Sequence, residues 1–307
     1  MLTSFLTIFE KVMILFIMIF IGYLCGKTGM VTKRGAQQIT SILLYVVTPC
    51  LIIASLQSII GQIGIKELIS AVFWSAFAMG LAILVSMLFF RKNPDYQKKI
   101  LRFAAAYSNS GYMGIPLVEA VFGSVGVAYA AMYNAVFSFF MWTHGYASVS
   151  SNRAPGWKQI ATNPGILGLA VAFPLFAFSV RLPEILESPI GSLASMNTPL
   201  AMIVVGIYIS GINLKELFTD RSLYLLSALR LVLLPSLTLL LMLPFGIDKT
   251  VASTVLLLCA APSATATAMF AVQFGGDAKL ASKAVALTTL FSVATMPFFC
   301  VLAKQLF

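Results

Sequence analysis

The stretch SNSGYMGIP, residues 108–116, brings small polar residues, two glycines and a proline into an otherwise apolar segment. Pro116 removes a backbone donor and clashes with the preceding turn, whereas Gly111 and Gly114 let the backbone unwind and allow another helix to approach closely. In hydrocarbon, loose backbone groups are costly. Asn109 in such a segment needs a hydrogen-bonding partner, which is protein, water or substrate. The stretch therefore predicts a broken helix that lines a binding site.

A second stretch, APSATATAM at residues 261–269, has the same character and contains Pro262 near its middle. Two broken helices offer free N–H groups and a partial positive charge at the start of their second halves, which suits a carboxylate. The hydroxyl and amide side chains expected to add hydrogen bonds are Ser108, Asn109, Ser110, Ser263, Thr265 and Thr267. The alternative is a pair of plain breaks, because Pro and Gly are common in membrane helices and Ser or Thr often bonds to its own helix.

The composition defines the elements that must position these residues. The chain has 307 residues, of which 60% are hydrophobic and 10% are charged. A soluble domain carries about 25% charged residues. The apolar runs are long rather than alternating, which excludes a transmembrane β-barrel. The sequence therefore predicts an all-α polytopic membrane protein without a large extramembrane domain, with the lipid bilayer as its surroundings.

Ten apolar segments approach the length of about 20 residues that one span needs. They are residues 5–25, 36–57, 67–90, 100–122, 125–149, 163–181, 190–211, 221–243, 249–274 and 281–304. Lys and Arg are concentrated in the connections after the odd-numbered spans, which places those connections in the cytoplasm and both termini outside. Because the basic residues follow this pattern, the net charge of +10 indicates membrane topology rather than nucleic-acid binding.

The chain also repeats itself at an offset close to half its length. IKEL ends at Leu68 and LKEL ends at Leu217, and a Thr-Pro pair precedes each of them, at Pro49 and at Pro199. Pro116 and Pro262 have a similar offset, 146 residues against 149 and 150 for the other two pairs. Each half holds five spans, so the second half enters the membrane upside down. We therefore expect two inverted five-helix repeats, residues 1–150 and 151–307, with crossed broken helices at spans 4 and 9.

Further polar residues inside the spans form a second group of candidates. Thr48, Pro49, Asn197, Thr198 and Pro199 kink spans 2 and 7, and either face the crossing or contact no solute. Glu119 in span 4 is a possible coupling site for a proton or cation, or a solvated group near the outer mouth.

Two basic residues inside the spans have other readings. His144, the one histidine, is expected to have a packing role, whereas Arg230 either snorkels, pairs with an acid or meets an anion. The four cysteines lack metal-ligand spacing and no cofactor is expected.

The motifs resemble the auxin efflux carrier family, which includes plant PIN-type carriers and bacterial permeases for malate and malonate. SNSGYMGIPL is similar to the span-4 crossover of that family, NTPLAMIVVGIYIS to its span-7 motif, and APSATATAMFAVQFGGD to its span-9 crossover. The resemblance implies a scaffold part from spans 1, 2, 6 and 7, a transport part from spans 3–5 and 8–10, and a homodimer. It also implies an organic anion bound at the crossover and carried by alternating access.

The expected function is therefore secondary transport of a small organic anion, such as malate, malonate or an auxin-like acid. The small residues of span 9 and the short cytoplasmic connections favour a small carboxylate and a bacterial inner membrane. A sodium- or proton-coupled antiporter, or a bile-acid-type symporter with the same crossed helices, is the main alternative. An intramembrane enzyme is disfavoured, because neither a nucleophile–base pair nor paired carboxylates are visible. A passive channel is disfavoured by analogy alone, because broken crossed helices suit a closed central site.

Overall fold

The computed structural model describes residues 2–150, 161–211, 217–218 and 220–307, and its regular elements are all helices. The first half of the chain runs through α1 (Leu2–Lys27), α2 (Lys33–Ile42), η1 (Leu43–Val47), α3 (Thr48–Ser58), α4 (Ile65–Leu88), α5 (Asp95–Ala106), η2 (Ser110–Gly114), α6 (Ile115–Phe140), η3 (Met141–Gly145) and α7 (Tyr146–Val149). The second half runs through α9 (Pro164–Ala177), α10 (Glu184–Ser195), α11 (Asn197–Ser210), α13 (Arg221–Ala228), η4 (Leu229–Leu233), α14 (Leu234–Met242), η5 (Leu243–Phe245), α15 (Lys249–Ala260), α16 (Ala266–Gln273) and α17 (Ala278–Leu306).

Six helical stretches of the described chain are long and apolar enough to cross a membrane. They are Arg34–Ser58, Ile65–Leu88, Ser110–Val149, Glu184–Ser210, Arg221–Phe245 and Ala278–Leu306. Shorter apolar helices cover Met13–Lys27, Pro164–Ala177 and Lys249–Ala260. The prediction of an all-helical membrane protein is confirmed, while the count of ten spans and their inverted arrangement stay predictions.

The longest of these stretches is interrupted at Gly123. Its backbone angles, φ 60° and ψ −152°, are non-helical and lie in a region that only glycine adopts readily. α6 therefore consists of two helices joined by a single residue. The sequence boundary between predicted spans 4 and 5 falls at the same place.

Prolines widen the helix turns that precede them. The π-helical turns η1, η2 and η4 end two residues before Pro49, Pro116 and Pro235, respectively. A proline lacks the N–H that would close a regular turn, and its ring clashes with the carbonyl four residues earlier. A π-helical turn gives that ring room without ending the helix.

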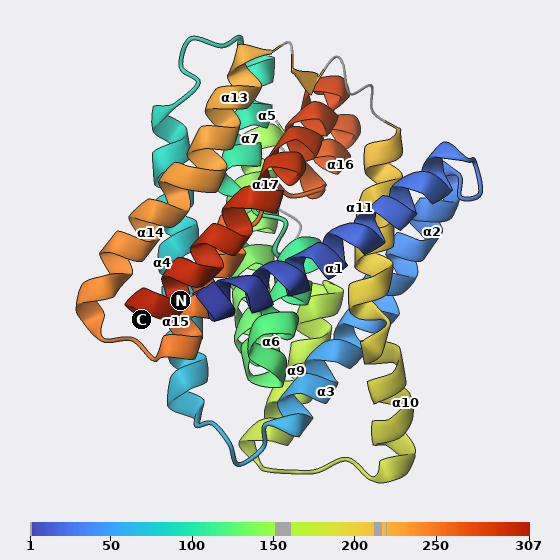
Figure 1. Cartoon of the computed structure of the whole chain (residues 1–307), viewed down its shortest axis with the longest axis vertical. Helices are drawn as coiled ribbons and strands as arrows, with labels where there is room; N and C mark the ends of the chain where they lie inside the picture. Colours follow the sequence, from blue (N-terminus) through green and yellow to red (C-terminus); the bar gives the residue numbers. More distant parts are fainter. Residues whose placement is uncertain (1, 151–160, 212–216, 219) are drawn as a thin grey trace.

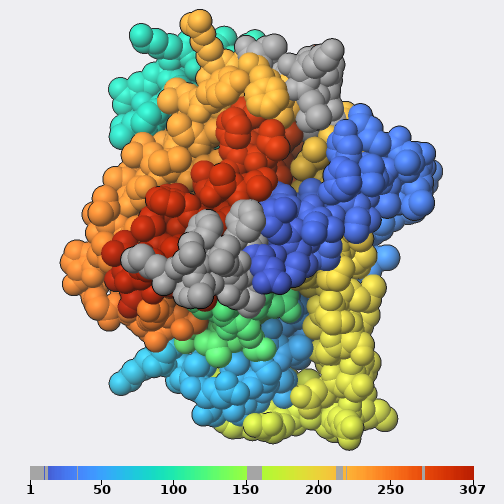
Figure 2. All heavy atoms as spheres, viewed as in Figure 1, coloured from blue at the N-terminus to red at the C-terminus, as the bar shows by residue number. Residues whose placement is uncertain are grey.

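The helices form two groups. Figure 1 shows α1, α2, α3, α10 and α11 on one side, with α4, α13, α14, α15 and α17 on the other. α1 and α11 lie so close together at Gly206 that a Cβ there would meet the carbonyl of Ile19 and the backbone nitrogen of Tyr23. Figure 2 shows α1 (blue) and α17 (red) on one face, beside the yellow helices α10 and α11. Apolar side chains such as Phe73 and Leu84 on α4 point outward, as expected for a surface that faces lipid.

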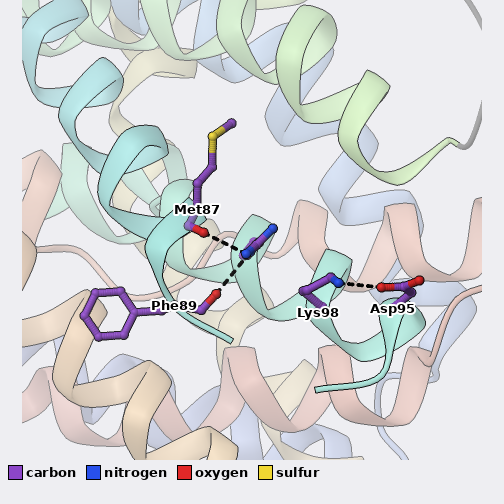
Figure 3. Close-up of polar contacts among 5 residues, drawn as sticks. Met87, Phe89, Asp95 and Lys98 are labelled. Atoms are coloured by element: carbon purple, nitrogen blue, oxygen red, sulfur yellow. Dashed lines mark hydrogen bonds and ion pairs between the residues drawn. The ribbon is translucent and has the colours of Figure 1, made fainter. Parts of the chain in front are cut away.

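The connection between α4 and α5 is fixed by three charged residues. Arg102 donates from Nη2 to the carbonyl of Met87 at 2.7 Å and from Nε to that of Phe89 at 3.1 Å, which caps the end of α4 (Figure 3). Lys98 forms an ion pair with Asp95 in the first turn of α5, and this contact lowers the pKa of the Asp95 carboxyl. The first half of the predicted broken span therefore starts from an anchored position.

Candidate substrate site at the helix crossover

The two predicted breaks meet through their backbones. The N–H of Asn109 donates to the carbonyl of Pro262 at 2.6 Å, and the N–H of Ala264 donates to the carbonyl of Tyr107 at 2.9 Å. Ser108 and Ser263 face each other across this isolated antiparallel bridge. Two short extended segments, 155 residues apart in sequence at Ser108 and Ser263, therefore satisfy each other's backbone groups where their helices are interrupted.

The breaks have different local causes. α5 ends at Ala106, and Tyr107 then adopts extended angles. Pro116 lies in the first turn of α6, two residues after the π-helical turn η2 that gives its ring room. Pro262, by contrast, lies inside the second break, between the end of α15 and the start of α16. Gly114 lets η2 approach α15, because a Cβ there would lie 2.5 Å from the Leu258 side chain.

Neighbouring helices supply hydrogen bonds to the crossover. The Ser110 hydroxyl donates to Oδ1 of Asn134 at 2.8 Å, and the Ser108 hydroxyl lies 3.3 Å from the Tyr133 hydroxyl. The backbone N–H of Ser263 donates to the hydroxyl of Thr288 at 3.1 Å.

Sequence reasoning did not select these three partners, Tyr133, Asn134 and Thr288. An available signal was Asn134 itself, since a polar amide within an apolar span needs a partner as Asn109 does.

Three polar atoms of the crossover are buried without a hydrogen-bond partner: Nδ2 of Asn109, Oγ of Ser263 and Oγ1 of Thr267. Their residues are 3%, 0% and 2% exposed, respectively. A buried polar atom left unpaired costs about 1–3 kcal/mol. The amide nitrogen only donates, so the group that would complete it is an acceptor oxygen. Gly111 is exposed and Thr265 half-buried, so the crossover reaches the surface of the chain.

The second group of sequence candidates lies elsewhere. The Thr48 hydroxyl donates to the carbonyl of Leu43 at 2.8 Å, and Pro49 packs on α9, where a Cβ on Gly168 would lie 2.8 Å from its Cα. Both residues of this pair are therefore accounted for by contacts with η1 and α9.

The Asn197-Thr198-Pro199 motif begins α11. Thr198 donates to Oε2 of Glu119 at 2.8 Å, and the adjacent Nδ2 of Asn197 is buried without a partner. The predicted coupling residue is therefore hydrogen-bonded to the span-7 motif.

His144 lies beside the first break. The Tyr107 hydroxyl donates to the carbonyl of Phe140 at 2.9 Å and lies 3.0 Å from Nδ1 of His144. Because its proton is committed to Phe140, the hydroxyl accepts from the histidine ring. His144 thus holds the side chain of Tyr107. The backbone carbonyl of Tyr107 accepts the hydrogen bond from Ala264 at the crossover. Among the described residues, no group of three or more His, Cys, Asp or Glu side chains is placed to hold a metal ion.

Comparison with known proteins identifies the family. The sequence profile of the family described as "Membrane transport protein" matches residues 7–156 and 154–300. The chain belongs to this membrane transport protein family. The resemblance to auxin efflux carriers is thereby confirmed. The family is one of transporters. The expectation of a transport protein rather than an enzyme therefore holds at the level of the family.

Relatives of this membrane transport protein cover almost its whole length. A putative malonate transporter of Rhizobium meliloti is 28% identical over 91% of this chain and 90% of its own. A protein of Methanothermobacter thermautotrophicus, named as an uncharacterized transporter, is 26% identical over 95% of this chain and 97% of its own. A transporter of the same description from Methanocaldococcus jannaschii is 24% identical over 92% and 95%, respectively.

Proposed function

We propose that the protein is a secondary transporter of a small organic anion that binds at the crossover. The observation that carries the proposal is the amide of Asn109. Its Nδ2 is buried, donates only and has no acceptor. It precedes the first turn of η2, where backbone N–H groups lack intrahelical acceptors. A carboxylate supplies the acceptor oxygens that this arrangement requires.

Hydroxyl groups from the second break support the same ligand. The Oγ of Ser263 and Oγ1 of Thr267 are buried without partners, and α16 begins at Ala266 between them. The starts of η2 and α16 carry partial positive charge, and the three unpaired side-chain donors belong to the two breaks that cross or to the first turn of α16. A dicarboxylate of the size of malonate suits this set, in agreement with the name of the Rhizobium relative.

The movement that carries the anion is proposed to occur between the two groups of helices. A narrow apolar gap separates α1 and α11 from η2, α6 and α17, and Met113, Met202 and Met296 are among its lining residues. Methionine side chains repack easily because they are unbranched and polarizable. Alternating access requires such sliding of one helix group past the other. The homodimer, the bacterial inner membrane and the outside termini remain part of this proposal.

Uptake into liposomes tests the proposal. Purified protein is reconstituted and supplied with labelled malonate, malate or indole acetate, with and without an imposed pH or sodium gradient. We expect saturable uptake of one acid, which Asn109→Ala abolishes. Asn93→Ala is the matched control, because Asn93 bonds to Ser222 in a connection away from the crossover. Cation flux without uptake of any acid would instead favour an antiporter centred on Glu119.

A further inference from the structure

Arg230 lies in the π-helical turn η4 and is 1% exposed. The sequence left three readings open: snorkelling to the interface, pairing with an acid, or contact with an anion. In the structure its hydrogen bonds go instead to backbone carbonyls. Nε donates to Ala261 at 3.0 Å, Nη1 donates to Ala105 at 3.1 Å, and Nη2 donates to Cys259.

These carbonyls belong to the C-terminal ends of two different helices. Ala105 lies in the last turn of α5, and Cys259 in the last turn of α15. A single guanidinium therefore caps the first halves of both broken helices, immediately before their backbones cross. Among the described contacts of Arg230 there is no carboxylate, so the buried charge is balanced by helix ends.

The charge of the Arg230 guanidinium is equal in magnitude to the combined partial charge of the two helix ends that it caps. A helix C-terminus carries about half an elementary negative charge, so two converging ends carry about one. The guanidinium supplies one positive charge and remains ionised. The helices that follow the two breaks begin on the other side of the crossing. The partial positive charges of their N-terminal ends are then not neutralised. Without Arg230, the four helix ends would nearly cancel.

We infer that Arg230 is a positioning residue that sets the charge preference of the crossover. By neutralising the two negative helix ends, it leaves the two positive ends free to bind a carboxylate. Its fork is occupied by carbonyl oxygens, so it acts without touching the substrate. This inference rests on the proposed function. A purely mechanical clamp is the alternative, in which the hydrogen bonds matter and the charge does not.

Two substitutions separate charge from geometry. Arg230→Lys keeps a cation but loses the fork, whereas Arg230→Met keeps similar bulk but has no charge. The probes are malonate and malonamide, which have nearly the same shape but differ in charge. Uptake of labelled malonate gives KM and Vmax, and competition by malonamide gives the discrimination between anion and neutral molecule. Size-exclusion chromatography and thermal unfolding report how much of each variant is folded.

We expect Arg230→Met to raise the KM for malonate at least tenfold and to remove most of the discrimination against malonamide. Arg230→Lys is expected to keep the KM within about threefold of wild type at neutral pH. Because a lysine loses its charge at high pH and an arginine does not, the KM of this variant rises with pH relative to wild type. Arg230→Lys thus provides a test even where Arg230→Met fails to fold.

Three results would overturn the inference. The first is a folded Arg230→Met with wild-type KM and discrimination. The second is a KM that rises equally in both variants. The third is an Arg230→Lys whose KM keeps a constant ratio to wild type at every pH. Failure of the proposed function is distinguishable, because wild-type protein would then neither bind nor transport malonate or the other acids, whatever stands at position 230.

Discussion

The hydroxyl of Thr198 donates a hydrogen bond of 2.8 Å to Oε2 of Glu119. The donor begins α11 and the acceptor lies in the part of α6 that continues from the crossover. This bond therefore joins helices on opposite sides of the apolar gap at which the proposed transport cycle moves them. Both side chains are half-buried, so water screens the bond in part.

Thr198→Val and Glu119→Ala remove the same bond, and their effects are expected to be non-additive. We expect a coupling free energy of about 1 kcal/mol between the two side chains. This value is low for a hydrogen bond to a charged acceptor, because both side chains are partly exposed. Unfolding of wild type, both single variants and the double variant in SDS titrations gives this value. Fully additive losses would mean that the two side chains do not interact in the membrane protein.

Ser263→Ala is expected to weaken malonate binding without lowering stability. The hydroxyl is buried without a partner, so its removal relieves an unpaired polar group. Loss of a hydrogen bond to a carboxylate is expected to raise the KM roughly 10- to 100-fold. The matched control is Ser110→Ala, which leaves Oδ1 of Asn134 without its donor and is expected to lower stability. A destabilised Ser263→Ala with unchanged KM would remove Ser263 from the site.

Gly206→Ala is expected to destabilise the protein by about 1–3 kcal/mol, because the added methyl would meet the backbone of α1 rather than a flexible side chain. Gly80→Ala in α4 is the control, since a Cβ there meets nothing within 4 Å. That control is expected to be neutral or stabilising by about 0.5–1 kcal/mol, because alanine favours a helix over glycine. Thermal unfolding in detergent distinguishes the two variants, and equal melting temperatures would contradict the close approach of α1 and α11.

Gly123→Ala is expected to cost about 1–3 kcal/mol through backbone strain, since φ is 60° at this position. Space is not the cause, because nothing lies within 4 Å of a Cβ at Gly123. Gly191→Ala is equally open but lies within helix α10, so it separates strain from the loss of glycine itself. If both variants melt at the same temperature, the tight turn at position 123 is not strained by a side chain.

The sequence was informative where local chemistry decides the backbone. Gly111, Gly114 and Pro116 indicated an interrupted helix, although the interruption itself, at Tyr107 to Asn109, lies just before them. The non-helical Gly123 lies between the predicted spans 100–122 and 125–149. The helical membrane class followed from the composition and from the length of the apolar runs.

The sequence was uninformative where the outcome depends on the rotation of one helix against another. Nothing in the pattern around Arg230 reveals that carbonyls of two distant helices converge on it. Tyr133 and Thr288 contact the crossover for the same reason, because their helices present that face to it. The π-helical turns were also missed, since the spacing before a proline does not distinguish a kink from a widened turn.

The single-residue turn at Gly123 also bears on how the chain enters the membrane during synthesis. Residues 110–122 form a helix shorter than the roughly 20 residues that one crossing requires. With no loop between them, this half-helix and the helix from Ser124 onward form one hairpin. The crossover itself is complete only after residues 261–264 have been translated, because the two breaks bond to each other.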